Sequence, residues 1–167
     1  SIASHLGAMG CTDVLVLEKE KMVGLGSTAK CAGGVRAQFS TPVNIYMSHY
    51  SIREFEKLDK EYGIQFVQCG YLFVLKTDEQ KARYLKNMEI QQKHGVAVTF
   101  ITKEEIAQLA PHYGLDGVVG GTFGKKDGLI DPYMMVDADF KKSRKFNIEF
   151  ETDTPCTGFR TSNGKIT

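Results

Sequence analysis

The sequence contains no tryptophan, only 4 prolines and no long hydrophobic run. No apolar stretch approaches the length of about 20 residues that a membrane-spanning helix requires, so no membrane span is expected. An excess of charge of either sign is also missing, because 21 basic residues stand against 20 acidic ones and leave a net charge of +1. This balance gives no reason to expect nucleic acid or an anionic membrane as a partner.

Paired cysteines are absent as well. The four cysteines are scattered and form no C-x-x-C pair, which predicts neither a zinc site nor a disulfide framework. Reduced thiols and a cytoplasmic location are the default expectation. The sequence has no H-E-x-x-H spacing, no G-x-S-x-G nucleophile elbow and no Walker loop. We therefore expect no metal site, and hydrolase or nucleoside-triphosphatase activity is disfavoured.

An apolar run that ends in an acidic residue is the most informative feature present. Val14–Leu17 predicts a buried parallel strand, Glu18 follows it directly, and a loop rich in glycine, serine and threonine comes next. In a nucleotide-binding βαβ unit, such an acid binds a ribose hydroxyl and such a loop lets phosphates approach backbone N–H groups. The stretch therefore predicts the second half of a dinucleotide-binding site.

The first half of that signature, a G-x-G-x-x-G loop opening a helix, does not precede Glu18. Residues 1–10 instead have the small and apolar pattern of the body of such a helix. We expect that the chain begins inside the motif and is a fragment of a longer protein. The alternative is a chain that begins naturally with a short helix.

The rest of the chain alternates helix and strand signals, which predicts an α/β protein with an α+β insertion. Helices are expected over 43–62 after an N-cap at Thr41, over 78–94 with Asp78 as the cap, over 102–109 with a capping box, and over 133–145. Strands are expected over 70–75, 96–101, 118–123 and 148–151. Hairpin turns are predicted at Asp127-Gly128 and at Asn163-Gly164.

Three blocks in this order resemble the flavin-dependent D-amino-acid oxidase superfamily, in particular its sarcosine oxidase beta-subunit and amine dehydrogenase branch: GSTAKCAGGVRAQFSTPVNI, GYLFVL and DGLIDPYMMV. The resemblance implies an incomplete Rossmann-like FAD-binding domain formed by residues 1–63 and 132–167. Residues 64–131 would form an inserted, partial substrate domain with helices and a mixed sheet. It also implies that FAD oxidises an amine beside a carboxylate to an imine.

The resemblance further implies roles for individual residues. Glu18 would bind the ribose, and Lys19 would lie near the adenosine. Ser27 and Thr28 would lie beside the pyrophosphate. The run from the ribityl chain to the flavin ring would be lined by Lys30, Cys31, Ala32, Gly33, Gly34 and Val35. Cys156 matches the position that meets the adenine edge, although the family usually has an aliphatic residue there.

Arg36 has two interpretations. Its planar donor fork suits a substrate carboxylate or the electron-rich edge of a flavin, and equally suits a structural ion pair. Other residues also have simpler explanations: Glu18 as a solvated carboxylate, Gly33 and Gly34 as a tight turn, Cys31 as a small packed residue. The aromatic residues of the 70–75 strand fit either a hydrophobic core or a substrate pocket.

The residues and the resemblance together predict part of an FAD-dependent oxidoreductase that acts on a small amine or amino acid. We expect the chain alone not to turn over an amine, and other subunits of a hetero-oligomer are plausible partners. A non-catalytic scaffold domain that has lost its cofactor is the alternative from another class. A nicotinamide-linked dehydrogenase is a further alternative, but the long insertion between Gly63 and Asp131 favours flavin.

Overall fold

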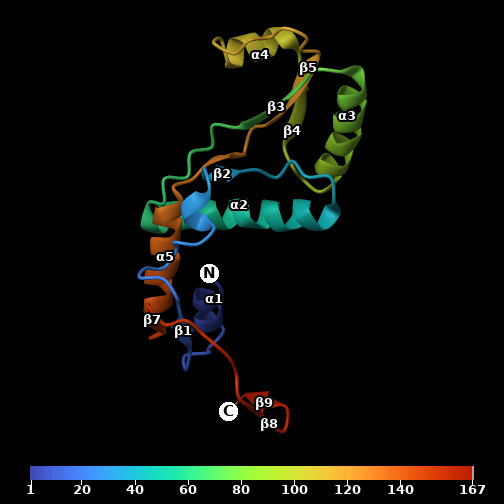
Figure 1. Cartoon of the computed structure of the whole chain (residues 1–167). Helices are drawn as coiled ribbons and strands as arrows, with labels where there is room; N and C mark the ends of the chain where they lie inside the picture. The colour runs from blue at the N-terminus through green and yellow to red at the C-terminus, as the bar shows by residue number, and fades with distance from the viewer. Residues whose placement is uncertain (167) are drawn as a thin grey trace. The chain divides into compact units, whose positions relative to one another are not determined.

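The computed structural model describes residues 1–166 as a mixed α/β chain with two compact units. One unit comprises residues 1–31 with 132–167, and the other comprises residues 32–131. In Figure 1 the first unit carries the blue and the orange to red ends of the colour range, and the second carries the colours between them. Thr167, the last residue of the predicted FAD-binding part, lies outside the described residues.

These units divide the chain at different points from the predicted domains. Residues 32–63 fall in the second compact unit, whereas the sequence grouped them with the cofactor-binding part. Compactness does not show which residues bind a cofactor or a substrate. The assignment of those functions to 1–63 with 132–167 and to 64–131 therefore stays a prediction.

The first unit contains two parallel strands and two helices that pack together. Its elements are α1 (Ile2–Ala8), β1 (Leu15–Leu17), the short 3-10 helix η1 (Thr28–Lys30), α5 (Pro132–Arg144) and β7 (Glu149–Glu151). β1 and β7 pair in parallel, with Val16 opposite Phe150. α1 packs on α5, and a Cβ at Gly7 would lie within 2.6 Å of the Phe146 side chain. The glycine therefore allows a close approach at this contact.

β1 is less buried than its apolar sequence predicts. Leu15 is 50% exposed and Leu17 is 44% exposed. β1 pairs with only β7 in this two-stranded sheet, so its apolar side chains lack the cover that both faces of a larger parallel sheet receive. The expectation of a strand is confirmed, and the expectation that it is buried is wrong for the described residues.

A tight hairpin follows the first unit's strands in sequence. Its strands β8 (Thr161–Ser162) and β9 (Lys165–Ile166) pair antiparallel around Asn163 and Gly164. Both turn residues have positive φ, 50° and 73°. Two successive positive φ values are what a type I′ turn requires, so the Asn-Gly prediction is confirmed.

The second unit is built around a three-stranded antiparallel sheet in the order β3-β5-β4. The strands are β3 (Tyr71–Leu75), β4 (Val98–Ile101) and β5 (Gly120–Gly124), accompanied by the helices α3 (Asp78–Lys93) and α4 (Lys103–Leu109). Leu75, Val98 and Ile106 are fully or almost fully buried in this unit. Because β5 pairs antiparallel with both neighbours, the prediction of a mixed sheet is wrong.

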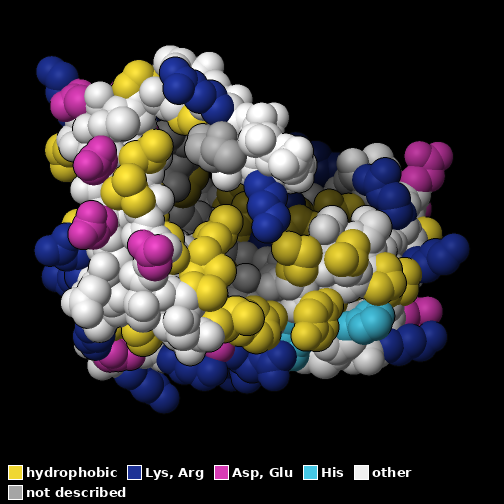
Figure 2. Space-filling model, turned by 90° about the horizontal axis from the view of Figure 1, so that it is seen from below, with side chains coloured by type: hydrophobic (Ala, Val, Ile, Leu, Met, Phe, Trp, Pro, Cys, Tyr) yellow, Lys and Arg dark blue, Asp and Glu magenta, His cyan; other side chains and the backbone are white. Residues whose placement is uncertain are grey.

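Helix α2 (Pro42–Tyr62) also belongs to the second unit. Its buried side chains are Ile45, Ile52 and Leu58. Gly63 ends the helix in the left-handed conformation with φ 65°, as a C-terminal glycine should. The exposed side carries Val43, Tyr46, Met47 and Tyr50. Figure 2 shows hydrophobic side chains gathered together with histidines on the face it views.

The helix starts agree with the sequence at α2 and α4 and differ at α3. Thr102 and Glu105 form the predicted capping box. Thr41 precedes Pro42 as expected but makes no side-chain cap bond. At α3 the cap is Thr77, whose Oγ1 accepts from the Gln80 N–H at 3.2 Å, and Asp78 is instead the first helical residue.

The predicted hairpin at Asp127-Gly128 is wrong. A tight turn does form, because the Asp127 N–H donates to the Gly124 carbonyl at 3.1 Å. The strand that follows, β6 (Gly128–Leu129), then pairs antiparallel with β2 (Gly34–Val35) rather than with β5. A tertiary contact decides the pairing, since the Asp127 side chain turns inward and binds the segment that follows β2.

Candidate functional site

Glu18 lies at the carboxyl end of β1, where the sequence predicts a ribose-binding acid. Its N–H donates to the Glu151 carbonyl at 2.8 Å, and its own carbonyl accepts from the Thr154 N–H at 2.9 Å. The carboxylate Oε1 accepts from the Glu20 N–H at 2.9 Å. Backbone and side chain are thus both held, and the half-buried carboxylate keeps further acceptor capacity.

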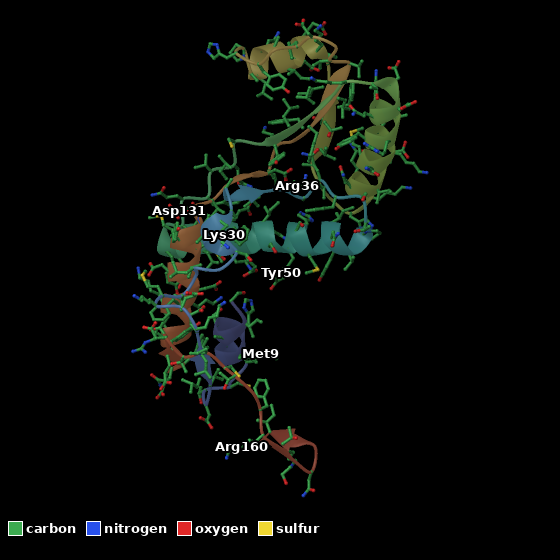
Figure 3. The ribbon with its side chains drawn as sticks, in the orientation of Figure 1. Met9, Lys30, Arg36, Tyr50, Asp131 and Arg160 are labelled. Atoms are coloured by element: carbon green, nitrogen blue, oxygen red, sulfur yellow. The ribbon has the colours of Figure 1, made fainter. Side chains whose placement is uncertain are left out.

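The small-residue loop after Glu18 is open to solvent. Ser27 precedes η1, and both Ser27 and Lys30 are exposed; Figure 3 labels Lys30. Cys31 is exposed in the first unit, and its packing against a cofactor stays a prediction. Hydroxyls and an ammonium group are the donors that phosphate oxygens accept from. The donor set of this loop therefore fits a pyrophosphate, as the acceptor at Glu18 fits a ribose.

Two more predicted residues of the first unit are also exposed. The Lys19 side chain is 72% exposed and lies 3.6 Å from a Glu20 carboxylate oxygen. Cys156 is exposed, with its Sγ within 3.8 Å of the Gly158 carbonyl oxygen. Neither contact is specific to a nucleotide, and both assignments stay predictions.

The remaining predicted cofactor residues, Ala32 to Val35, fall in the second unit. Gly33 has φ 73°, a conformation that favours glycine, and its carbonyl accepts from the Ile130 N–H at 2.9 Å. A Cβ at Gly34 would lie 3.6 Å from the Tyr71 ring. The positive φ accounts for a glycine at position 33, and the roles of Gly33 and Gly34 at the flavin stay predictions. The predicted set is divided between the two units, with Glu18 to Cys31 and Cys156 in one and Ala32 to Arg36 in the other.

Arg36 rests against an aromatic wall formed by Phe39, Tyr71 and Phe73. Its guanidinium carbon lies 4.8 Å from the Phe39 ring centroid, 5.0 Å from that of Phe73 and 5.8 Å from that of Tyr71. Figure 3 labels Arg36 beside β2 in this unit. Within residues 1–166 no carboxylate lies within ion-pair distance of the guanidinium. The structural ion pair that the sequence allowed is thus not formed among these residues.

The aromatic residues of β3 serve both interpretations that the sequence left open. Tyr71 and Phe73 are half-buried, with ring centroids 5.3 Å apart, and Phe73 lies 5.5 Å from Tyr84. Their rings contact each other as core residues do and also contact Arg36. The guanidinium is attracted to the faces of these rings, and a few polar groups among aromatic side chains are typical of small-molecule sites.

Sequence analysis missed a buried polar cluster that lies next to Arg36 in the chain. Asp127 is 1% exposed, Thr122 is 2% exposed and Gln38 is 7% exposed. Asp127 Oδ1 accepts from the Ala37 N–H at 2.9 Å, and Oδ2 accepts from Gln38 Nε2 at 3.1 Å. Gln38 Nε2 also donates to the Tyr71 carbonyl at 2.8 Å, while its Oε1 accepts from Thr122 Oγ1 at 2.9 Å. Nothing local in the sequence marks Asp127 as buried, because Asp-Gly is an ordinary surface turn.

Burial raises the pKa of the Asp127 carboxyl above its ordinary value. The hydrogen bonds from Gln38 and Ala37 and the positive charge of Arg36 oppose this shift, since each favours the ionised form. Both oxygens act as acceptors in the cluster, which is the pattern of a carboxylate.

Residues 1–167 match the family described as FAD dependent oxidoreductase (DAO). The chain belongs to this family. As a member of the FAD dependent oxidoreductases it has relatives over nearly its whole length. It is 31% identical over 163 residues to rat mitochondrial dimethylglycine dehydrogenase, a match that covers 96% of the chain and 19% of the relative. It is 29% identical over 134 residues to 4-methylaminobutanoate oxidase (formaldehyde-forming) of Paenarthrobacter nicotinovorans, covering 79% and 16%.

Solved flavoenzyme structures match the chain in fold. The L-proline dehydrogenase of P. horikoshii superposes with a TM-score of 0.92 at 33% identity, over 99% of this chain and 44% of that one. A glycine oxidase from Bacillus cereus, at 21% identity and a TM-score of 0.81, supports the fold alone. The chain spans 19% of the rat dimethylglycine dehydrogenase and 16% of the 4-methylaminobutanoate oxidase. It spans 33% of a Xenopus laevis FAD-dependent oxidoreductase domain-containing protein.

None of the helices within residues 1–166 is long and apolar enough to cross a membrane. In the same residues, no three side chains from His, Cys, Asp and Glu gather in a group that could hold a metal ion.

Proposed function

We propose that this chain is part of an FAD-dependent oxidoreductase that oxidises the C–N bond of a small amino acid or N-methyl amino acid to an imine. Family membership over residues 1–167 supports the flavin chemistry. The relatives' names fit the substrate class, since dimethylglycine, 4-methylaminobutanoate and L-proline are all amines that carry a carboxylate. The sarcosine-like branch suggested by the sequence is the finer form of this proposal.

The observation that carries the substrate proposal is the placement of Arg36. Its guanidinium is half-buried on the aromatic wall of Phe39, Tyr71 and Phe73, and no described carboxylate pairs with it. A guanidinium has a planar donor fork that binds a carboxylate through two parallel hydrogen bonds. Arg36 would therefore bind and orient the substrate carboxylate, and the aromatic side chains would exclude water from its apolar part.

Residues of the first unit would hold the cofactor. When bound, FAD supplies the two-electron acceptor for the carbon beside the amine nitrogen. Glu18 would accept hydrogen bonds from ribose hydroxyls, Ser27 and Thr28 would donate to the pyrophosphate, and Lys30 would lie beside the ribityl chain. The protein contributes position and charge rather than a covalent step.

The whole protein's activity goes beyond this chain. The relatives are three or more times longer than the part they share with it, so we propose that turnover of an amine needs residues outside these 167. A hetero-oligomer of the sarcosine oxidase type is consistent with the resemblance. These residues alone are expected to show no measurable amine oxidation.

One relative favours a second candidate function. The mouse mitochondrial pyruvate dehydrogenase phosphatase regulatory subunit is 26% identical over 132 residues, covering 78% of this chain and 15% of that protein. Its name describes a regulatory subunit rather than an oxidoreductase. A non-catalytic binding domain with the same fold is therefore the second candidate.

A visible absorption spectrum of the purified protein, with its intact mass, tests the first candidate against the second. Flavin bands as isolated, or after addition of FAD, are expected for the oxidoreductase. A protein that is colourless after excess FAD has been added and the unbound FAD removed would support the regulatory candidate. The intact mass shows whether the protein measured is longer than 167 residues, and so which chain the spectrum describes.

A further inference from the structure

Asp127 is a buried carboxylate to which the proposed function gives no role. It comes directly after the turn that ends β5 and before β6, and only 1% of the residue is exposed. A Cβ at Gly124 would overlap the Asp127 carboxylate, so the glycine makes room for it. The side chain is therefore accommodated by the packing of two segments and is not an incidental surface group.

The hydrogen bonds of Asp127 hold the chain on the carboxyl side of Arg36. Oδ1 fixes the Ala37 N–H at 2.9 Å, and Oδ2 fixes Gln38 through Nε2 at 3.1 Å. On the other side of Arg36, Val35 is paired with Gly128 in the β2–β6 ladder. Arg36 is thus flanked by anchored residues, and its backbone has little freedom to move the guanidinium.

The same cluster also holds one edge of the aromatic wall. Gln38 donates to the Tyr71 carbonyl at 2.8 Å, and the Asp127 carbonyl accepts from the Gly70 N–H at 2.8 Å. Thr122, opposite Phe73 in the sheet, donates to Gln38 at 2.9 Å. Hydrogen bonds therefore connect both the Arg36 segment and the aromatic wall to the segment around Asp127.

Charge gives a second link between the two residues. The positive charge of Arg36 is the one charged group that lowers the pKa of Asp127 against the effect of burial. A neutral residue at position 127 would lose this attraction as well as an acceptor. A buried carboxylate is costly to keep unless it is bonded and opposed by charge, which makes a role in arranging Arg36 a physical reason for its presence.

We propose that Asp127 is a positioning residue for Arg36: its carboxylate holds the guanidinium over the aromatic wall, ready to bind the carboxylate of an amino-acid substrate. This inference rests on the proposed function, because it takes Arg36 as the residue that binds substrate. Asp127 itself contacts neither substrate nor flavin, and it acts through Ala37, Gln38 and the charge of Arg36.

The test compares carboxylate binding in Asp127→Asn and wild-type protein. N-methylglycine is the probe, and dimethylamine, which lacks the carboxylate, is its matched control ligand. An NMR titration of the Arg36 side-chain N–H signal gives the affinity. We expect Asp127→Asn to bind N-methylglycine about tenfold more weakly, because two donors that face the carboxylate lose a charged acceptor. Faster hydrogen exchange of the Ala37 amide should accompany this loss. Dimethylamine should not shift the Arg36 signal in either protein.

Control variants separate positioning from general stability. Ile106→Val removes one buried methyl group from the same unit and should leave the affinity for N-methylglycine unchanged. Thr122→Val removes only the hydrogen bond from Thr122 to Gln38. Its affinity for N-methylglycine should be about threefold weaker than that of wild type. This variant keeps the inference testable if Asp127→Asn fails to fold. Arg36→Lys has no guanidinium signal, so its titration is followed at the backbone amide of residue 36. This variant should lose most of the binding, because an ammonium group lacks the planar fork.

Three results would overturn the inference. They are unchanged affinity in Asp127→Asn, unchanged affinity in Thr122→Val when Asp127→Asn is unfolded, and unchanged affinity in Arg36→Lys. A parallel FAD titration reports on the proposed function separately. The wild-type protein could fail to bind FAD while Asp127→Asn still shows the expected loss of affinity for N-methylglycine. That result would remove the oxidoreductase proposal and leave the positioning of Arg36 by Asp127 supported.

Discussion

Glu18 in the first compact unit and Asp127 in the second are held in opposite ways. Glu18 in the first unit is half-buried, and its carboxylate accepts from the Glu20 N–H two residues along. Asp127 in the second unit is buried and bonds to residues 90 and 89 positions away. A local arrangement leaves the carboxylate free to take a ligand, whereas a long-range one uses the carboxylate to join segments.

The units also differ in their strands. β1 and β7 form a two-stranded parallel sheet with exposed leucines, and β3, β5 and β4 form an antiparallel sheet over a buried core. A larger sheet buries more apolar surface for each strand, so the stability of the second unit should depend more strongly on single side chains. The predictions below test this contrast, from the largest expected effect to the smallest.

Gly128→Ala should have the largest effect. A Cβ at this position would overlap the Val67 carbonyl oxygen, so the β2–β6 pairing that anchors the Arg36 segment would have to open. We expect a loss of more than about 3 kcal/mol in the free energy of unfolding, measured by urea denaturation. Gly114→Ala is the matched control, because a Cβ there meets nothing within 4 Å. Equal effects in the two variants would contradict the close packing at β6.

Ile106→Ala compared with Leu15→Ala tests the contrast between the units directly. Ile106 is 0% exposed in the second unit, and its truncation should cost about 2–5 kcal/mol. Leu15 is 50% exposed in the first unit, and its truncation should cost about 1 kcal/mol or less. Urea denaturation of both variants gives the two values. A larger loss for Leu15→Ala would mean that β1 is covered by apolar contacts that its exposure does not indicate.

Thr102→Ala should weaken the start of α4 moderately. The variant removes the hydroxyl that accepts from the Glu105 N–H and so breaks the capping box. A loss of about 1 kcal/mol is expected, together with faster amide exchange in the first turn of α4. Thr41→Ala is the matched control, since Thr41 precedes a helix without making a side-chain cap bond. An equal loss in Thr41→Ala would show that the cap bond is not the cause.

The pH dependence should be the subtlest effect. Because the folded pKa of Asp127 is raised above the ordinary value of 3.8, the folded state holds this proton more tightly than the unfolded state. The stability contribution of the protonated group is therefore fully present below pH 3.8 and is lost as the pH rises through the raised pKa. As the pH rises through this window, wild type should lose stability relative to Asp127→Asn. The free energies of unfolding of both proteins, measured at several pH values, test this. A shift in the opposite direction would show that the bonds from Ala37 and Gln38 outweigh burial.

Local patterns predicted much of the fold. The capping box at Thr102, the Gly63 end of α2 and the Asn-Gly hairpin all depend on residues within a few positions of one another, and the structure contains each of them. The errors arose where distant segments decide the outcome. The Asp127-Gly128 turn has ordinary hairpin chemistry, but the strand after it pairs with β2 because Asp127 binds Ala37.

The candidate site divides in the same way. Glu18 could be predicted from the strand that precedes it, and the structure places it at the end of β1. The aromatic wall under Arg36 and the cluster of Gln38, Thr122 and Asp127 could not, because their members come from three separate stretches of the chain. The periodicity of one stretch does not show which other stretch it contacts. A single sequence carries no other signal for such long-range contacts.

An equilibrium titration with FAD, followed by visible absorption, tests the central claim most directly when wild type, Glu18→Gln and Glu20→Gln are compared. Glu20 is the matched control, since it is an acid on the same loop to which no cofactor role is given. The account predicts a shift of the flavin bands as FAD binds to wild type, about tenfold weaker FAD binding in Glu18→Gln and unchanged binding in Glu20→Gln. A wild-type protein that binds no FAD, or a Glu18→Gln variant that binds it as tightly as wild type, would contradict the account.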